Sequence, residues 1–200
     1  MRSRLLVSGF DRFGGISSNP SELIAGRLAS DPPKGVLAEG VVLPTVFGEA
    51  ARILLGRIET FRPTHVLALG LGRQLREVHV ERFALNFADT EHGDNAGNAP
   101  RESQVVQGGP AGYFASLPVR KLVERLVEEG VAARSSTTAG TFVCNDLFFR
   151  MMHALAARPD PPFAGFVHVP AVRGMPEAAP DAPPIETLER ALRRALEAIL

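Results

Sequence analysis

The sequence predicts an α/β fold: a single three-layer α/β/α domain, residues 1–200, around a mostly parallel, twisted central sheet. Short apolar runs of strand length alternate along the chain with segments whose apolar residues recur at helical spacing. A length of 200 residues is ordinary for one domain, and a hydrophobic fraction of 45% is enough to build one core. Each element can be justified in turn.

The N-terminal part of the chain predicts two strands and two helices. "RLLVSGF" is typical of a buried strand, and the helix after it should begin at "NPSEL". There Asn19 can cap the helix, Pro20 suits its first turn, and Glu22 completes a capping-box arrangement. A second helix should end at Pro63, before the buried strand "HVLALG". Its apolar face is marked by residues at helical spacing, namely Phe47, Ala51, Leu54, Leu55 and Ile58.

The rest of the chain continues the alternation. "ERFALNF" predicts a strand that Glu81 opens, and the turn-rich residues 88–103 follow it. "PVRKLVERLVEEG" predicts an amphipathic helix that ends at a glycine. "AGFVHVP" predicts a late strand, the proline-rich residues 173–186 should pack weakly beside a pocket entrance, and a last helix should begin near Ile185. Between them, a further helix is marked by four residues spaced four apart, Val143, Leu147, Met151 and Leu155.

Composition excludes several classes of function. Lysine plus arginine equals aspartate plus glutamate at 22 each, so the chain lacks the excess of positive charge that is typical of a nucleic-acid binder. A single cysteine cannot form a disulfide framework or a multi-thiolate zinc site. The apolar run Leu5–Val7 is too short for a signal peptide, and no segment is long enough to span a membrane. We therefore expect a cytoplasmic protein that binds neither nucleic acid nor membrane.

The lone cysteine, Cys144, falls in the first turn of a predicted helix, just after a loop that contains Gly140. Unpaired amides and the positive end of the helix dipole favour the thiolate there, which is the nucleophilic form. An arbitrary buried cysteine is more often a small core residue, so position alone leaves that alternative open.

A thiolate nucleophile needs a base that later acts as an acid, and histidine is the usual one. Among five histidines, His168 lies near the carboxyl end of a predicted strand, where open α/β sheets place their sites. His153 is nine residues beyond Cys144 in the same helix, too far along the axis for contact. Glu81, beside apolar strand residues, could orient an imidazole, although an exposed charge at a strand end would look the same.

Six segments together resemble the pyroglutamyl peptidase I family, also called pyrrolidone-carboxylate peptidases. The similarity runs from near the N-terminus to about Pro170, in the family's order and with compatible spacings. The segments are "SGFDRFGG…NPSE", "ERFALN", "DNAGN", "GGPAGYFASLPVRKL", "TAGTFVCN" and "GFVHVP".

The resemblance implies a cysteine peptidase that removes N-terminal pyroglutamate (5-oxoproline) from peptides through an acyl-enzyme. It places the family's catalytic residues on Glu81, Cys144 and His168, and implies no metal and no cofactor. It also implies a homo-oligomer, a dimer or a tetramer. The positions matching the family's lactam pocket are Phe10, Phe13, Asn19, Phe142 and Val143, of which Asn19 could equally be only a helix cap.

Two positions depart from the family pattern. Leu71 stands where a polar residue commonly recognises the lactam, and Glu91 matches an arginine that lies near the oxyanion in many members. Either Glu91 brings a negative charge to the site, or its loop is placed differently and Arg73 or Arg101 substitutes. The departures keep two alternatives open, a related thiol hydrolase with another substrate preference and a non-catalytic binding protein that keeps the fold.

Overall fold

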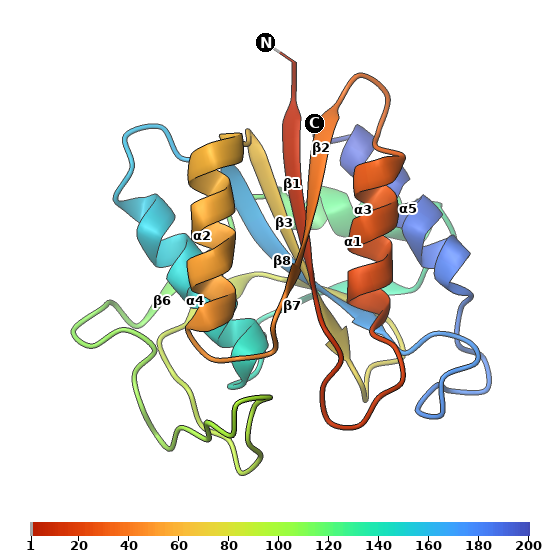
Figure 1. Cartoon of the computed structure of the whole chain (residues 1–200). Helices are drawn as coiled ribbons and strands as arrows, with labels where there is room; N and C mark the ends of the chain where they lie inside the picture. Colours follow the sequence, from red (N-terminus) through yellow and green to blue (C-terminus); the bar gives the residue numbers. More distant parts are fainter. Residues whose placement is uncertain (1) are drawn as a thin grey trace.

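A six-stranded sheet runs through the middle of the molecule in the order β2-β1-β3-β8-β4-β7 (Figure 1). The computed structural model describes residues 2–200. The strands of this sheet are β1 (Arg4–Phe10), β2 (Leu37–Leu43), β3 (His65–Gly72), β4 (Val78–Glu81), β7 (Ala133–Ser136) and β8 (Phe163–Pro170).

The sheet is mostly parallel, as the sequence predicted. β1 pairs in parallel with β2 and β3, and β3 pairs in parallel with β8. β4 is antiparallel to β8, and β7 is parallel to β4. The register of β3 and β8 places Gly70 opposite His168, so the carboxyl ends of these two central strands lie together.

Five helices cover the two faces of the sheet, which gives the predicted three layers (Figure 1). One face carries α1 (Pro20–Ser30), α3 (Val119–Glu128) and α5 (Ile185–Glu197). The other face carries α2 (Glu49–Phe61) and α4 (Val143–Ala156).

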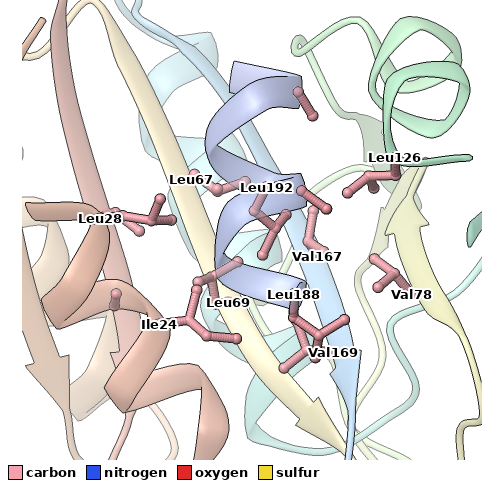
Figure 2. Close-up of a cluster of buried hydrophobic side chains, with 14 of the residues drawn as sticks. Ile24, Leu28, Leu67, Leu69, Val78, Leu126, Val167, Val169, Leu188 and Leu192 are labelled. Atoms are coloured by element: carbon pink, nitrogen blue, oxygen red, sulfur yellow. The ribbon is translucent and has the colours of Figure 1, made fainter. Parts of the chain in front are cut away.

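Strand alternation divides the core between these faces. Leu67 and Leu69 of β3 pack toward α1 and α5, whereas Val66 and Ala68 pack toward α2 and α4. Figure 2 shows the first of these two clusters, where Leu188 and Leu192 of α5 lie over Leu67 and Leu69. On β8, Val167 belongs to this cluster and Phe166 to the opposite one, so His168 shares the side of Phe166, the side of α4.

Four strands were not expected from the sequence, and one expected strand is divided. β2 and β7 lie at the edges of the sheet, where partly exposed residues weaken the apolar signal. The predicted strand 81–87 is wrong as one element, because the chain leaves the main sheet after Glu81. It continues as β5 (Phe83–Leu85), which pairs with β6 (Gly112–Phe114) in a separate two-stranded sheet. Glu81 therefore ends β4 and does not open a strand.

The start of α1 also differs in detail from the capping-box expectation. Asn19 is the N-cap and Pro20 is the first helical residue, as predicted. However, Asn19 Oδ1 accepts hydrogen bonds from both the backbone amide and the hydroxyl of Ser21, at 3.1 and 2.8 Å. Across residues 2–200, Glu22 makes no side-chain hydrogen bond that would complete a capping box.

Candidate active site

The only thiol of the chain lies at the amino end of α4. Val143 is the first residue of this helix and Cys144 the second, and Cys144 is partly exposed. The first helical hydrogen bond runs from the Asp146 amide to the Phe142 carbonyl, at 3.1 Å. The earlier amides have no acceptor within the helix, so they are available to a negative oxygen or sulfur beside Cys144.

Gly70 of β3 makes room for the sulfur. A Cβ atom at this position would lie 2.9 Å from Cys144 Sγ and 2.8 Å from Cζ of Phe166, both too close for any side chain. The backbone of β3 thus forms one wall beside the thiol. Because Gly70 stands opposite His168 in the β3–β8 ladder, the same wall brings the sulfur to the end of β8.

His168 and Glu81 form a buried pair beside this wall. His168 Nδ1 lies 2.8 Å from Glu81 Oε1, and the two side chains are 11% and 1% exposed. The contact fixes the ring so that Nε2 is the nitrogen left for another partner. Glu81 Oε2 is buried and has no hydrogen-bond partner among residues 2–200.

The surroundings of His168 favour its charged form. Burial lowers the pKa of the imidazole, but the negative charge and hydrogen bonding of Cys144, followed by those of Glu81, raise the pKa of His168 to about 9. At neutral pH the ring therefore carries a proton, between the sulfur of Cys144 and the carboxyl group of Glu81. A thiol, an imidazole and a carboxyl group in this order can act as nucleophile, base and orienting group.

Two adjoining cavities open beside this trio. The inner cavity, of about 470 Å³, is lined by Glu81, His168, Leu71 and the loop residues Thr138, Ala139 and Gly140, among others. The outer cavity, of about 800 Å³, is lined by Thr90, His92, Gly93 and Glu177, among others. Four residues line both cavities, namely Phe13, Arg73, Gln74 and Phe142.

The chain as a whole matches known proteins of one kind. Residues 3–200 match the family model described as pyroglutamyl peptidase. The chain belongs to this family. It is 38% identical to pyrrolidone-carboxylate peptidase 1 of Ralstonia nicotianae, over 98% of this chain and 92% of that protein. It is 40% identical to pyrrolidone-carboxylate peptidase of Streptomyces coelicolor, over 98% and 91% of the two chains.

Solved structures of the family share the whole fold. Pyroglutamyl peptidase I from Bacillus amyloliquefaciens superposes with a TM-score of 0.93 at 31% identity, over 100% of this chain and 96% of that one. A mutant pyrrolidone carboxyl peptidase from Pyrococcus furiosus superposes with a TM-score of 0.92 at 31% identity, over 98% and 97%. The family expected from the six sequence segments is therefore confirmed.

The residues expected to line a lactam pocket in this family member do not all lie at the cavities. Phe13 and Phe142 line both cavities, with ring centroids 6.1 Å apart and planes inclined by 36°. Phe10 and Val143 are buried in the core, at 3% and 0% exposure. They back the site from the α2–α4 side of the sheet.

Asn19 lies fully buried at the start of α1 and lines neither cavity. Besides its cap contacts with Ser21, its Nδ2 donates to the Asp11 carbonyl at 2.8 Å. Asp11 in turn accepts from the backbone amide of Thr45. Asn19 thus ties the loop that carries Phe13 to the helix and to the end of β2.

The expectation that Glu91 brings a negative charge to the site is wrong for this structure. Its side chain is 82% exposed, lies 3.9 Å from Arg101, and lines neither cavity. Arg101 lies with it at the surface, at 60% exposure. Of the two arginines considered as substitutes, only Arg73 lines the cavities.

The other histidines have different surroundings. His153 Nδ1 lies 2.8 Å from the Tyr113 hydroxyl, and His65 Nδ1 lies 2.9 Å from Thr64 Oγ1. His92 is on the outer cavity. His79 stands opposite His168 in the β4–β8 ladder and lines the inner cavity. Burial, and then the charge of Arg134, lower the pKa of His79 and keep it neutral, and its Nε2 accepts from Arg134 Nε at 3.0 Å.

Sequence reasoning missed the polar residues that hold the loops around the site. Asn145, next to Cys144 and fully buried, accepts from the Leu85 amide and donates to the carbonyls of Leu85 and Phe87. Asp94 accepts from the amides of Phe47, Ala96 and Asn98. The available signals were the asparagine beside Cys144 and the turn-rich sequence "DNAGN". Neither signal indicates which distant backbone groups Asn145 and Asp94 bind.

Proposed function

We propose that this pyroglutamyl peptidase works as a cysteine peptidase with Cys144 as nucleophile, His168 as base and acid, and Glu81 as the orienting carboxylate. The observation that carries this assignment is the buried His168–Glu81 pair, 2.8 Å apart, beside the only thiol of the chain. The substrates are peptides with an N-terminal pyroglutamyl group.

The reaction would proceed in two stages. Cys144 Sγ attacks the carbonyl carbon that joins the lactam to the next residue, and the oxygen becomes negative. The amides of the first turn of α4 stabilise that oxygen. His168 then gives its proton to the leaving nitrogen, the carbon–nitrogen bond breaks, and a thioester remains. Water, deprotonated by His168, attacks the thioester, which releases pyroglutamate and returns the thiolate.

The aromatic residues would receive the lactam. Pyroglutamate is flat and has no ammonium group, so apolar walls cost it little desolvation. A flat ring between two aromatic faces takes up roughly 7 Å, about twice an ordinary carbon–carbon contact. Phe13 and Phe142 lie 6.1 Å apart, so the loop that carries Phe13 must open slightly to admit the lactam between them. Phe10 and Val143 would support these walls from behind, and Asn19 would hold the Phe13 loop.

We further propose that the protein acts in the cytoplasm and as a homodimer or homotetramer, without metal or cofactor. No helix within residues 2–200 has the length and apolar character needed to cross a membrane. The oligomeric proposal rests on the family resemblance and is tested by sedimentation or light scattering.

The deciding experiment is hydrolysis of a pyroglutamyl chromogenic amide, beside the matching prolyl amide. The prolyl compound has the same ring size but carries a charged amine in place of the lactam. Hydrolysis of the first and not the second supports the assignment. Cleavage of neither would leave the non-catalytic alternative, and cleavage of another blocked amine in preference would favour the related thiol hydrolase.

A further inference from the structure

The two cavities adjoin, because Phe13, Arg73, Gln74 and Phe142 line both of them. The inner cavity contains His168, which in the proposed mechanism protonates the leaving nitrogen. The part of the substrate beyond that nitrogen would therefore begin beside His168, in the cavity that Arg73 also lines.

Arg73 is the only arginine or lysine among the residues that line either cavity. Its side chain is 39% exposed. Nη2 lies 3.1 Å from Glu177 Oε1, and Nη1 donates to the Gly14 carbonyl at 3.4 Å. A guanidinium has five N–H donors in a planar fork, so these two contacts leave donors for a ligand.

Glu177, which lines the outer cavity, forms an ion pair with Arg73. It belongs to the proline-rich segment between β8 and α5, and Gly14 belongs to the loop that carries Phe13. Arg73 thus connects both loops to the end of β3. Because Glu177 is itself negative, it also opposes any anion that approaches the guanidinium.

We propose that Arg73 recognises the leaving part of the substrate, by binding the free carboxylate of the residue that directly follows the pyroglutamyl group. This inference rests on the proposed function and adds a substrate preference to it: dipeptides with a free carboxyl terminus over the same dipeptides as amides. Planar, bidentate pairing with a carboxylate is the contact that the guanidinium fork makes best.

The test compares kcat/KM for pyroglutamyl-alanine and for pyroglutamyl-alanine amide, and takes the ratio of acid to amide. Arg73→Gln should lower this ratio by about fivefold, the range of a partly exposed charge pair. Glu177→Gln should raise the ratio, because it removes the opposing charge and keeps the guanidinium. Arg101→Gln is the control, since Arg101 lines neither cavity, and it should leave the ratio unchanged.

The outcomes separate this inference from the proposed function. If the wild type cleaves no pyroglutamyl compound, the proposed function fails. If it cleaves them but Arg73→Gln leaves the ratio unchanged, Arg73 does not recognise the carboxylate and the inference is overturned. A purely structural role would predict that Arg73→Gln and Glu177→Gln act alike, since both break the same ion pair. If Arg73→Gln does not fold, Glu177→Gln decides: a raised ratio supports the inference, and an unchanged or lowered one overturns it.

Discussion

His168 Nδ1 and Glu81 Oε1 lie 2.8 Å apart although their residues are not paired in the β4–β8 ladder. Glu81 stands opposite Phe166, and His168 stands opposite His79. The contact is therefore a diagonal one on a single face of the sheet, between the end of β4 and the end of β8. Because β4 is antiparallel to β8, Glu81 at the end of β4 lies beside Phe166, two residues before His168.

The pH dependence of activity should follow from this contact. The charge of Glu81 helps to raise the pKa of His168 to about 9, so kcat/KM should fall as the pH rises through about 9 and the ring loses its proton. Glu81→Gln removes that charge, so it should move the alkaline limb to lower pH and reduce turnover. Rates from pH 6 to 10 check this, and an unmoved alkaline limb would argue against Glu81 as the partner of His168.

Replacement of Cys144 should remove activity without removing the fold. Cys144→Ala deletes one partly exposed sulfur, so the melting temperature should change little while hydrolysis becomes negligible. Iodoacetamide should inactivate the wild type. An alanine variant with most of its activity would disprove the nucleophile assignment.

His168 and Cys144 should lose activity as a unit. His168→Ala should cost several orders of magnitude, roughly as much as the double replacement, because groups that share one step are not additive. Single-turnover rates of the two single variants and the double variant measure this. Independent, additive losses would contradict a shared mechanism.

Gly70→Ala should impair catalysis more than folding. The new methyl group would lie 2.9 Å from Cys144 Sγ and 2.8 Å from Phe166, so the sulfur must move away from its place beside His168. Gly56→Ala in α2 is the matched control, with no atom near the added methyl, and should be neutral or slightly stabilising, by roughly 0.5–1 kcal/mol. Equal losses of kcat/KM in both variants would show that the Gly70 contact is not specific.

Asn145→Ala should destabilise the protein by about 2–4 kcal/mol, because it leaves three partly buried backbone groups of Leu85 and Phe87 unpaired. Urea unfolding measures this. Gln104→Ala is the control: it removes one exposed bond to the Gly108 amide and should cost far less. A small effect at Asn145 would mean that these groups find other partners.

The sequence predicted the elements whose apolar pattern is strong and missed those whose pattern is weak. The buried strands β1, β3 and β8 and the amphipathic helices were found, and with them the ends of β8 and α4, where His168 and Cys144 lie. The edge strands β2 and β7 were missed because partly exposed residues interrupt their pattern. The apolar residues beside Glu81 made it a candidate, and the resemblance decided for it, since no local pattern shows that the chain leaves the sheet at Arg82 or that β4 runs antiparallel to β8.

The exposed position of Glu91 could not be predicted either, because it also depends on contacts that no local pattern reveals. The local sequence places Glu91 in a turn-rich loop. The conformation of that loop involves Asp94, whose carboxylate accepts hydrogen bonds from the amide of Phe47 and from two amides of its own turn. Such contacts join residues far apart in sequence, so they become visible only in the folded chain.

The chain has one cysteine, and that cysteine is partly exposed. If Cys144 is the nucleophile, as proposed, a thiol assay on the folded protein counts active sites with no background from other thiols. The amount of thiol reagent taken up and the activity lost should then rise together, up to one equivalent per chain. Any preparation can thus be standardised by titration before its rates are compared with those of a variant.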